Sequence, residues 1–111
     1  MTQNEELIRY MEQQVPFNRV LGIEIMAIEE GSVIMRVPMK PEFIGDPVRP
    51  AVHGGVISAL ADTVAGLAVF RCIEWGRAAS TVDLRVDYLR PVPPHGAQRV
   101  SCTSVDGIGN Y

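Results

Sequence analysis

One carboxylate stands alone in an apolar stretch, AVHGGVISALADTVAGLAVF, residues 51–70. Apart from His53, Asp62 is the only ionisable residue there. Burial of an unpaired carboxylate is costly, so Asp62 must be paired, hydrogen-bonded or protonated. Removal from water disfavours the charged form, which suits a general base working near neutral pH. The structural alternative is that Asp62 binds a backbone or hydroxyl group and fixes a helix or dimer contact.

A second chemical feature, His53-Gly54-Gly55, opens the same stretch. The first N–H groups of a helix lack intrahelical partners and lie at the positive end of its dipole. Two glycines allow close approach, so this helix start could bind an anion or oxyanion. A histidine here could equally be only a hydrogen-bonded cap.

The spacing of these two features indicates how they could cooperate. Gly54 and Asp62 are just over two helical turns apart, and two turns span about 11 Å, which is too far to hold one small reacting group. A two-fold dimer would let one chain supply the helix start and the other the carboxylate. Gly55, Ser58, Asp62 and Gly66 share one helix face, where small residues permit close approach.

The elements that must position these residues follow from periodicity and helix or turn signals. Asn4 with Glu5 and Glu6 predicts a helix start, and Pro16 its end, giving an N-terminal helix within residues 1–16. The other predicted elements are strands at Leu21–Glu29, Ser32–Met39, Ala79–Leu89 and Gln98–Val105, a turn at Glu30-Gly31, loops at 41–52 and 74–77, and a helix at Gly54–Cys72.

This order predicts a single α+β domain over residues 1–111, with an antiparallel sheet packed around a helix. The helix is apolar almost all round, so a curved sheet or a partner subunit must cover it.

Composition excludes several classes of protein. Hydrophobic residues make up 47% and charged residues 21%, which is typical of a globular chain. A net charge of −3 argues against nucleic-acid binding. The longest apolar run, Val56–Phe70, is short for a membrane span and contains Asp62. The acidic N-terminus is unlike a secretory signal, and Cys72 and Cys102 form no disulfide or metal pattern, so we expect a cytoplasmic protein.

Two segments together, VHGGVISALADTVAG and STVDLRVDYLRPVP, resemble the PaaI-like acyl-CoA thioesterases of the phenylacetate-degradation group. The resemblance runs from about Leu21 to about Val105. It implies a hotdog fold, in which an antiparallel sheet wraps a long helix. It also implies a homodimer or homotetramer that binds acyl-CoA at the dimer interface. Coenzyme A would enter only as part of the substrate, with no further cofactor and no metal.

The resemblance also implies residue roles. The Gly54 N–H, with Gly55 beside it, would polarise the thioester carbonyl, and His53 would position that turn. Asp62 of the other chain would act as general base or nucleophile. Ser80, or alternatively Thr81, would orient the water, and Arg90 would lie near the nucleotide.

The chain departs from the family pattern in two places. Relatives often carry Asn in the loop before HGG, close to the substrate carbonyl, whereas Asp46 is the nearest equivalent here. Relatives also continue with one or two more strands where SVDGIGNY ends. We therefore expect a fragment, a processed product, or a sheet completed by another chain.

Three other functions stay open on these residues. A non-catalytic acyl-CoA-binding or interaction module would fit Asp46 and the short C-terminus. A hydratase or dehydratase needs a His with Asp or Glu at other positions, and only His53 and His95 are present. A carboxylate-dependent, self-cleaving peptidase using Asp62 or Asp46 is motivated by the chain end alone.

Overall fold

The computed structural model describes residues 2–29, 32–72, 79–95 and 97–102, and gives only the backbone of the last segment. The predicted turn at Glu30-Gly31 and loop at 74–77 lie outside these residues, as does the stretch after residue 102.

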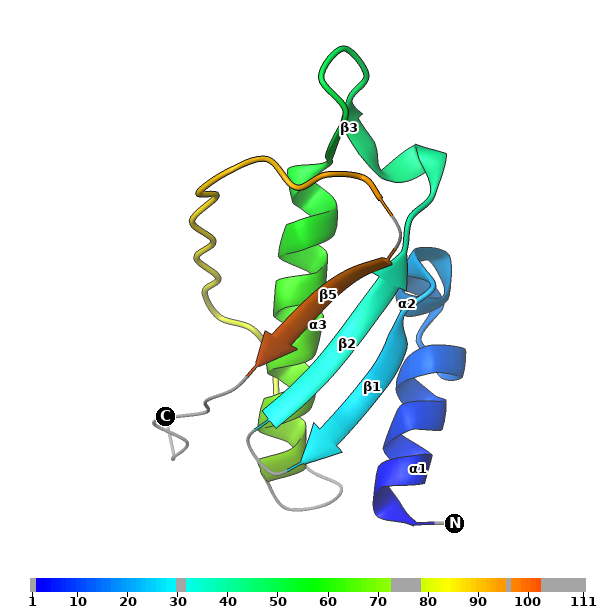
Figure 1. Ribbon diagram of the computed structural model, residues 1–111. Helices are drawn as coiled ribbons and strands as arrows, with labels where there is room; N and C mark the ends of the chain where they lie inside the picture. The colour runs from blue at the N-terminus through cyan, green and yellow to red at the C-terminus, as the bar shows by residue number, and fades with distance from the viewer. Residues whose placement is uncertain (1, 30–31, 73–78, 96, 103–111) are drawn as a thin grey trace.

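The N-terminal segment folds as helices placed beside strand β1 (Figure 1). Helix α1, Gln3–Arg9, starts from a capping box in which the Glu5 N–H donates to Thr2 Oγ1 at 3.1 Å and the Thr2 N–H donates to Glu5 Oε2 at 3.2 Å. Thr2 is therefore the N-cap, and the predicted helix start at Asn4 was wrong. A π-helical turn, Tyr10–Gln14, follows α1.

Pro16 both ends this first run and begins another helix, α2, Pro16–Leu21. Sequence reasoning used Pro16 only as a terminator, although proline also suits the first position of a helix. Gly22, with φ of 75°, ends α2. The first strand consequently begins at Glu24 and not at Leu21.

The main sheet is antiparallel, in the order β1-β2-β5, with β1 at Glu24–Glu29, β2 at Ser32–Pro38 and β5 at Ala97–Cys102. The central strand β2 alternates between faces, and its inward side chains Val33, Met35 and Val37 are fully buried. The first two predicted strands and their antiparallel pairing are confirmed.

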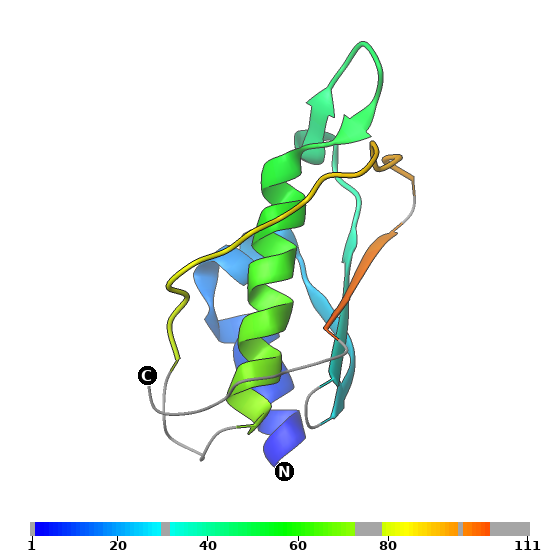
Figure 2. The same cartoon turned by 90° about the vertical axis from the view of Figure 1, so that its left-hand side faces the viewer.

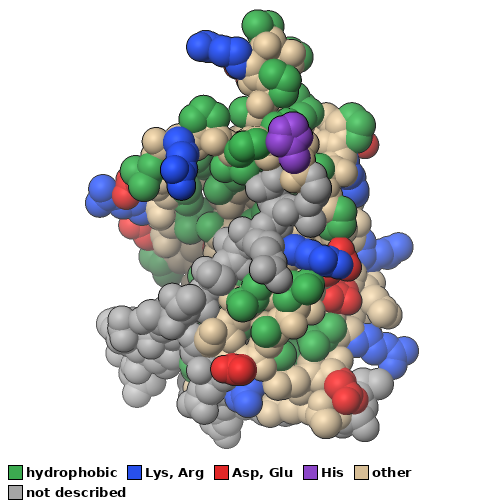
Figure 3. Space-filling view, viewed as in Figure 1, with side chains coloured by type: hydrophobic (Ala, Val, Ile, Leu, Met, Phe, Trp, Pro, Cys, Tyr) green, Lys and Arg blue, Asp and Glu red, His purple; other side chains and the backbone are tan. Residues whose placement is uncertain are grey.

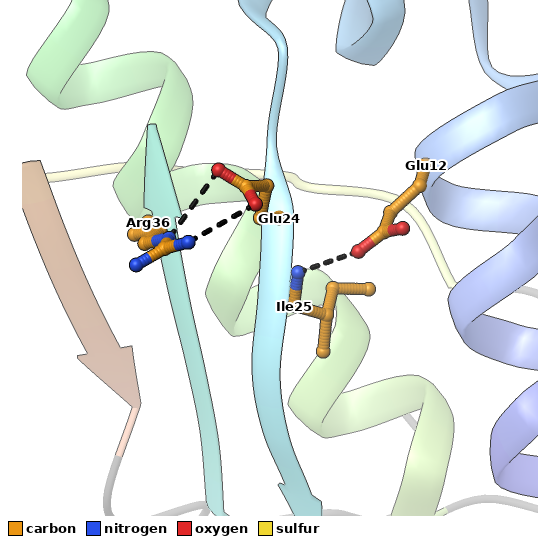
Figure 4. Close-up of polar contacts among 4 residues, drawn as sticks. All are labelled: Glu12, Glu24, Ile25 and Arg36. Carbon is orange, nitrogen blue, oxygen red and sulfur yellow. Dashed lines mark hydrogen bonds and ion pairs between the residues drawn. The ribbon is translucent and has the colours of Figure 1, made fainter. Parts of the chain in front are cut away.

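Two carboxylates support the sheet on the β1 side (Figure 4). Glu12 accepts a hydrogen bond from the backbone N–H of Ile25 at 2.7 Å, close to an irregularity in the β1–β2 register. Glu24 pairs across the strands with Arg36 through two contacts, at 3.3 and 3.2 Å. The N-terminal segment thus satisfies a donor on the outer strand of the described sheet.

Helix α3, Gly54–Cys72, is confirmed with the predicted bounds. It packs against the sheet through Leu60, Val64, Leu67 and Ala68, so the long helix and the antiparallel sheet form the two layers (Figures 1 and 2). The α+β prediction is therefore confirmed.

The opposite face of α3 is only partly covered by the described residues. The helix is long and apolar enough to cross a membrane by length and composition alone, a property shared by core helices of other proteins. No other helix among the described residues meets that test.

The predicted loop at 41–52 contains more structure than expected. A 3₁₀ turn, Pro41–Phe43, leads into a small hairpin of β3, Ile44–Asp46, and β4, Ala51–Val52. The hairpin projects from the molecule directly before α3 (Figure 1).

The predicted strand at Ala79–Leu89 is wrong. Residues 79–95 have no regular secondary structure and run along α3 (Figure 2). The alternating residues Val82, Leu84 and Tyr88 are 99%, 43% and 54% exposed, so this pattern packs into no core. A strand requires a hydrogen-bonded neighbour as well as a pattern, and no described strand forms a ladder with residues 79–89. Among the described residues, one backbone hydrogen bond links a strand to the 79–95 segment, from the Val52 N–H of β4 to the Val92 carbonyl, at 2.9 Å. The last predicted strand, by contrast, is confirmed as β5 within the described residues.

Candidate active site

Asp62 and Thr81 meet at the centre of the candidate site. Asp62 lies half-buried on α3, and Thr81 comes from the irregular segment laid along that helix. The Thr81 hydroxyl donates to Asp62 Oδ1 at 2.5 Å. This charge-assisted hydrogen bond satisfies part of the carboxylate and fixes its orientation. The family resemblance implied Ser80 first, with Thr81 as the alternative, and Thr81 is the residue that the structure places on Asp62.

An open cleft of about 240 Å³ surrounds this pair. Its lining residues come from α3 and the 79–95 segment: Asp62, Ala65, Gly66, Val69, Ala79, Ser80, Thr81, Asp83 and Leu84. Ser80 is therefore close enough to contact a molecule in the cleft without touching Asp62 directly. Among the described residues, no group of three or more His, Cys, Asp or Glu side chains could hold a metal ion.

The start of α3 is capped by its own histidine. His53 Nδ1 accepts a hydrogen bond from the Gly55 N–H at 2.8 Å, while its backbone carbonyl accepts from Val56 at 3.0 Å. A side chain that accepts from the second helical residue is an N-cap. His53 thus positions this turn. It also occupies the Gly55 N–H, and no hydrogen bond from the Gly54 N–H occurs within the part of the chain that the structure describes.

Tyr88 is a site residue that the sequence did not reveal. Its hydroxyl donates to the Gly54 carbonyl at 2.9 Å and is hydrogen-bonded to Ser58 Oγ. Its ring lies against Gly54, since a Cβ built there would be 3.4 Å from Tyr88 Cε1. The contact joins residues 34 positions apart through an irregular segment, so periodicity carries no sign of it.

The two chemical features stay apart within one chain. Gly54 stands at the first position of α3 and Asp62 two turns further along the same helix. The structure therefore does not bring the free amide and the carboxylate together, as the spacing predicted.

Two other candidates lie away from the Asp62–Thr81 pair. Asp46 Oδ1 accepts from the backbone N–H groups of Val48 at 2.9 Å and Arg49 at 3.1 Å, so it stabilises the β3–β4 turn. These two hydrogen bonds give Asp46 a structural role, and the side-chain oxygen of asparagine could accept the same bonds. Arg90 is exposed at a bend of the 79–95 segment.

Charge is scattered over the surface. In the face drawn in Figure 3, basic and acidic side chains are interspersed among hydrophobic ones, with no single-sign patch among the coloured residues. Together with the net charge of −3, this distribution differs from that of a nucleic-acid-binding surface.

Comparison with known proteins decides the family. The family model for the thioesterase superfamily matches residues 50–104, which include His53, Asp62 and Thr81. A solved structure from Shewanella oneidensis, described as related to that superfamily, is 30% identical with a TM-score of 0.75, covering 87% of this chain and 71% of that one. This chain belongs to the thioesterase superfamily.

Two further relatives are similar to this chain in sequence or in fold. A phenylacetic acid degradation-related protein from Ralstonia eutropha is 27% identical with a TM-score of 0.70, covering 86% of this chain and 74% of that one. The medium/long-chain acyl-CoA thioesterase YigI of Salmonella typhimurium is 34% identical over 93 residues, covering 69% of this chain and 58% of that protein. The chain thus spans less than two thirds of this curated relative. The hotdog fold and the PaaI-like resemblance are confirmed.

Proposed function

We propose that this thioesterase-superfamily protein hydrolyses acyl-CoA thioesters. The observation that carries the proposal is the Asp62–Thr81 hydrogen bond at the edge of an open cleft. A half-buried carboxylate held by a hydroxyl is placed to accept a proton from water. A thioester is already activated, so a base and an oxyanion site suffice, without metal or cofactor.

The proposed reaction uses two chains. The Gly54 N–H of one chain donates to the thioester carbonyl oxygen, and Tyr88 and His53 hold that helix start in place. Asp62 of a second copy takes a proton from water as the water oxygen attacks the carbonyl carbon. The carbon–sulfur bond then breaks, and the departing coenzyme A thiolate takes up that proton. Direct attack by the Asp62 carboxylate is the alternative route.

The arrangement implies a homodimer, alone or within a homotetramer, because one chain keeps its amide and carboxylate two turns apart. Arg90 is proposed to contact the phosphate groups of coenzyme A. We also propose a cytoplasmic location, with which the half-buried free thiol of Cys72 is consistent.

The substrate class is tested with purified full-length protein and a panel of acetyl-, hexanoyl-, decanoyl-, palmitoyl- and phenylacetyl-CoA, with thiol release measured by a colorimetric reagent. We expect turnover of at least one acyl-CoA. Tight binding of acyl-CoA without thiol release would instead indicate a binding module. A loss of mass on prolonged incubation would indicate self-cleavage.

A further inference from the structure

A groove between α3 and the N-terminal helices leads directly away from the Asp62–Thr81 pair. We propose that this groove holds the acyl chain of the substrate, that Gly66 keeps its entrance open, and that Tyr10 and Phe70 limit the chain length. The inference rests on the proposed thioesterase function and names the part of the substrate that each element recognises.

The groove has a volume of about 260 Å³, and its lining changes from polar to mainly apolar along its length. Asp62, Thr63 and Thr81 line it at the site, where the reacting bond would lie. The walls farther from Asp62 are mainly apolar. They come from the N-terminal segment and from α3: Leu7, Tyr10, Met11, Val15, Leu67 and Phe70. Asn18 also lines it, but its amide already donates to the Met11 carbonyl at 3.0 Å. A groove with a polar reactive end and an apolar remainder fits an acyl chain joined to a polar head.

A second opening of about 340 Å³ extends the same path. It shares Leu7, Tyr10 and Phe70 with the first and adds Glu6 and Gln14. The apolar path therefore ends near Phe70, where polar side chains of the N-terminal segment begin.

The length of this path sets an expected chain length. Asp62 and Phe70 are eight residues apart on α3, about 12 Å at 1.5 Å per residue. An extended covalent chain advances about 1.2 Å per bond, taking about 3.6 Å for the three bonds of an extended residue. About ten carbons would therefore reach Phe70, which makes a medium-length acyl chain the best fit.

Gly66 occupies the decisive position at the entrance. It follows Asp62 by one turn on the same face of α3 and lines both the 240 Å³ cleft and the groove. A Cβ added there meets nothing within 4 Å, so a larger side chain would fit without moving the backbone. A leucine at this position would instead project into the open path beside Asp62.

The test compares Gly66→Leu with wild type for decanoyl-CoA and acetyl-CoA. We expect the ratio of the two kcat/KM values, decanoyl over acetyl, to fall at least tenfold, since the loss of even one buried methylene contact changes discrimination by about tenfold or more. Gln13→Leu is the matched control. Gln13 is exposed on the N-terminal segment that forms one wall of the groove, but it lines neither opening. It should keep the wild-type ratio. Tyr10→Ala should move the preferred chain to greater length.

An unchanged ratio in a folded Gly66→Leu protein, shown by urea unfolding, would overturn the inference while leaving the thioesterase function intact. If wild type hydrolyses no acyl-CoA, the proposed function fails, and calorimetric titration with decanoate and acetate still tests the groove. Decanoate binding by wild type that is lost in Gly66→Leu would support the groove. Equal binding by both proteins, or none by either, would contradict it.

Discussion

The contact between Asp62 and Thr81 defines the site at the scale of single residues. The resemblance put Ser80 before Thr81 although the two are adjacent and chemically alike, whereas the structure places the Thr81 hydroxyl on Asp62. Only the path of the 79–95 segment along α3 decides which hydroxyl reaches the carboxylate.

Removal of this hydroxyl should therefore affect catalysis. Thr81→Val keeps the side-chain shape but loses the donor to Asp62, and we expect kcat to fall by about 10- to 100-fold, part of the usual contribution of a positioned base. Thr81→Ser should recover most of the activity. Steady-state kinetics on the best acyl-CoA measures the effect. A greater loss in Ser80→Ala than in Thr81→Val would show that Ser80, and not Thr81, serves the reaction.

At the scale of elements, the sequence predicted those helices and strands that carry a strong periodic pattern of apolar residues. The long helix Gly54–Cys72 and the β2 strand follow from periodicity and are found as expected. The 79–89 segment alternates equally well but lacks a described neighbour, because pairing depends on chain topology that a pattern does not encode. Helix α2 was missed since Pro16 has two opposite meanings, ending one helix and starting the next.

The β3–β4 hairpin supplies a direct test of how elements position the site. A Cβ at Gly45 would lie 2.7 Å from His53 Cα, which is backbone at the start of α3. Gly45→Ala should therefore reduce the free energy of unfolding by about 1–3 kcal/mol, the usual cost of overpacking. Gly66→Ala makes the same change in open helix and should raise stability by about 0.5–1 kcal/mol. Urea unfolding measures both, and equal stabilities would refute the close approach.

At the scale of the whole molecule, one proposed site needs two chains. Gly54→Pro tests the amide without destroying the helix, because proline is favoured at the first helical position and lacks the N–H, while its Cβ would lie 3.4 Å from Tyr88 Cε1. This variant and Asp62→Asn should each be inactive alone. Mixed after unfolding and refolding together, they should recover about a quarter of wild-type activity, since about half of the dimers are mixed and each mixed dimer holds one complete site.

No recovery in a mixture shown to contain mixed dimers would place both groups of each site in a single chain. Light scattering of the wild type must also show at least a dimer. A monomer with full activity would exclude the shared site directly.

Turnover of acyl-CoA by Asp62→Asn tests directly whether the Asp62 carboxylate activates water. Asparagine preserves size and can still accept the Thr81 hydrogen bond, but it cannot take a proton from water. We expect a 10²- to 10⁴-fold lower kcat in a protein that unfolds at the wild-type urea concentration. The matched control is Asp87→Asn, whose carboxylate is exposed and paired with Arg85, and which should retain wild-type turnover. Wild-type turnover in folded Asp62→Asn would contradict the account, because Asp62 would then serve only to fix Thr81 on the helix.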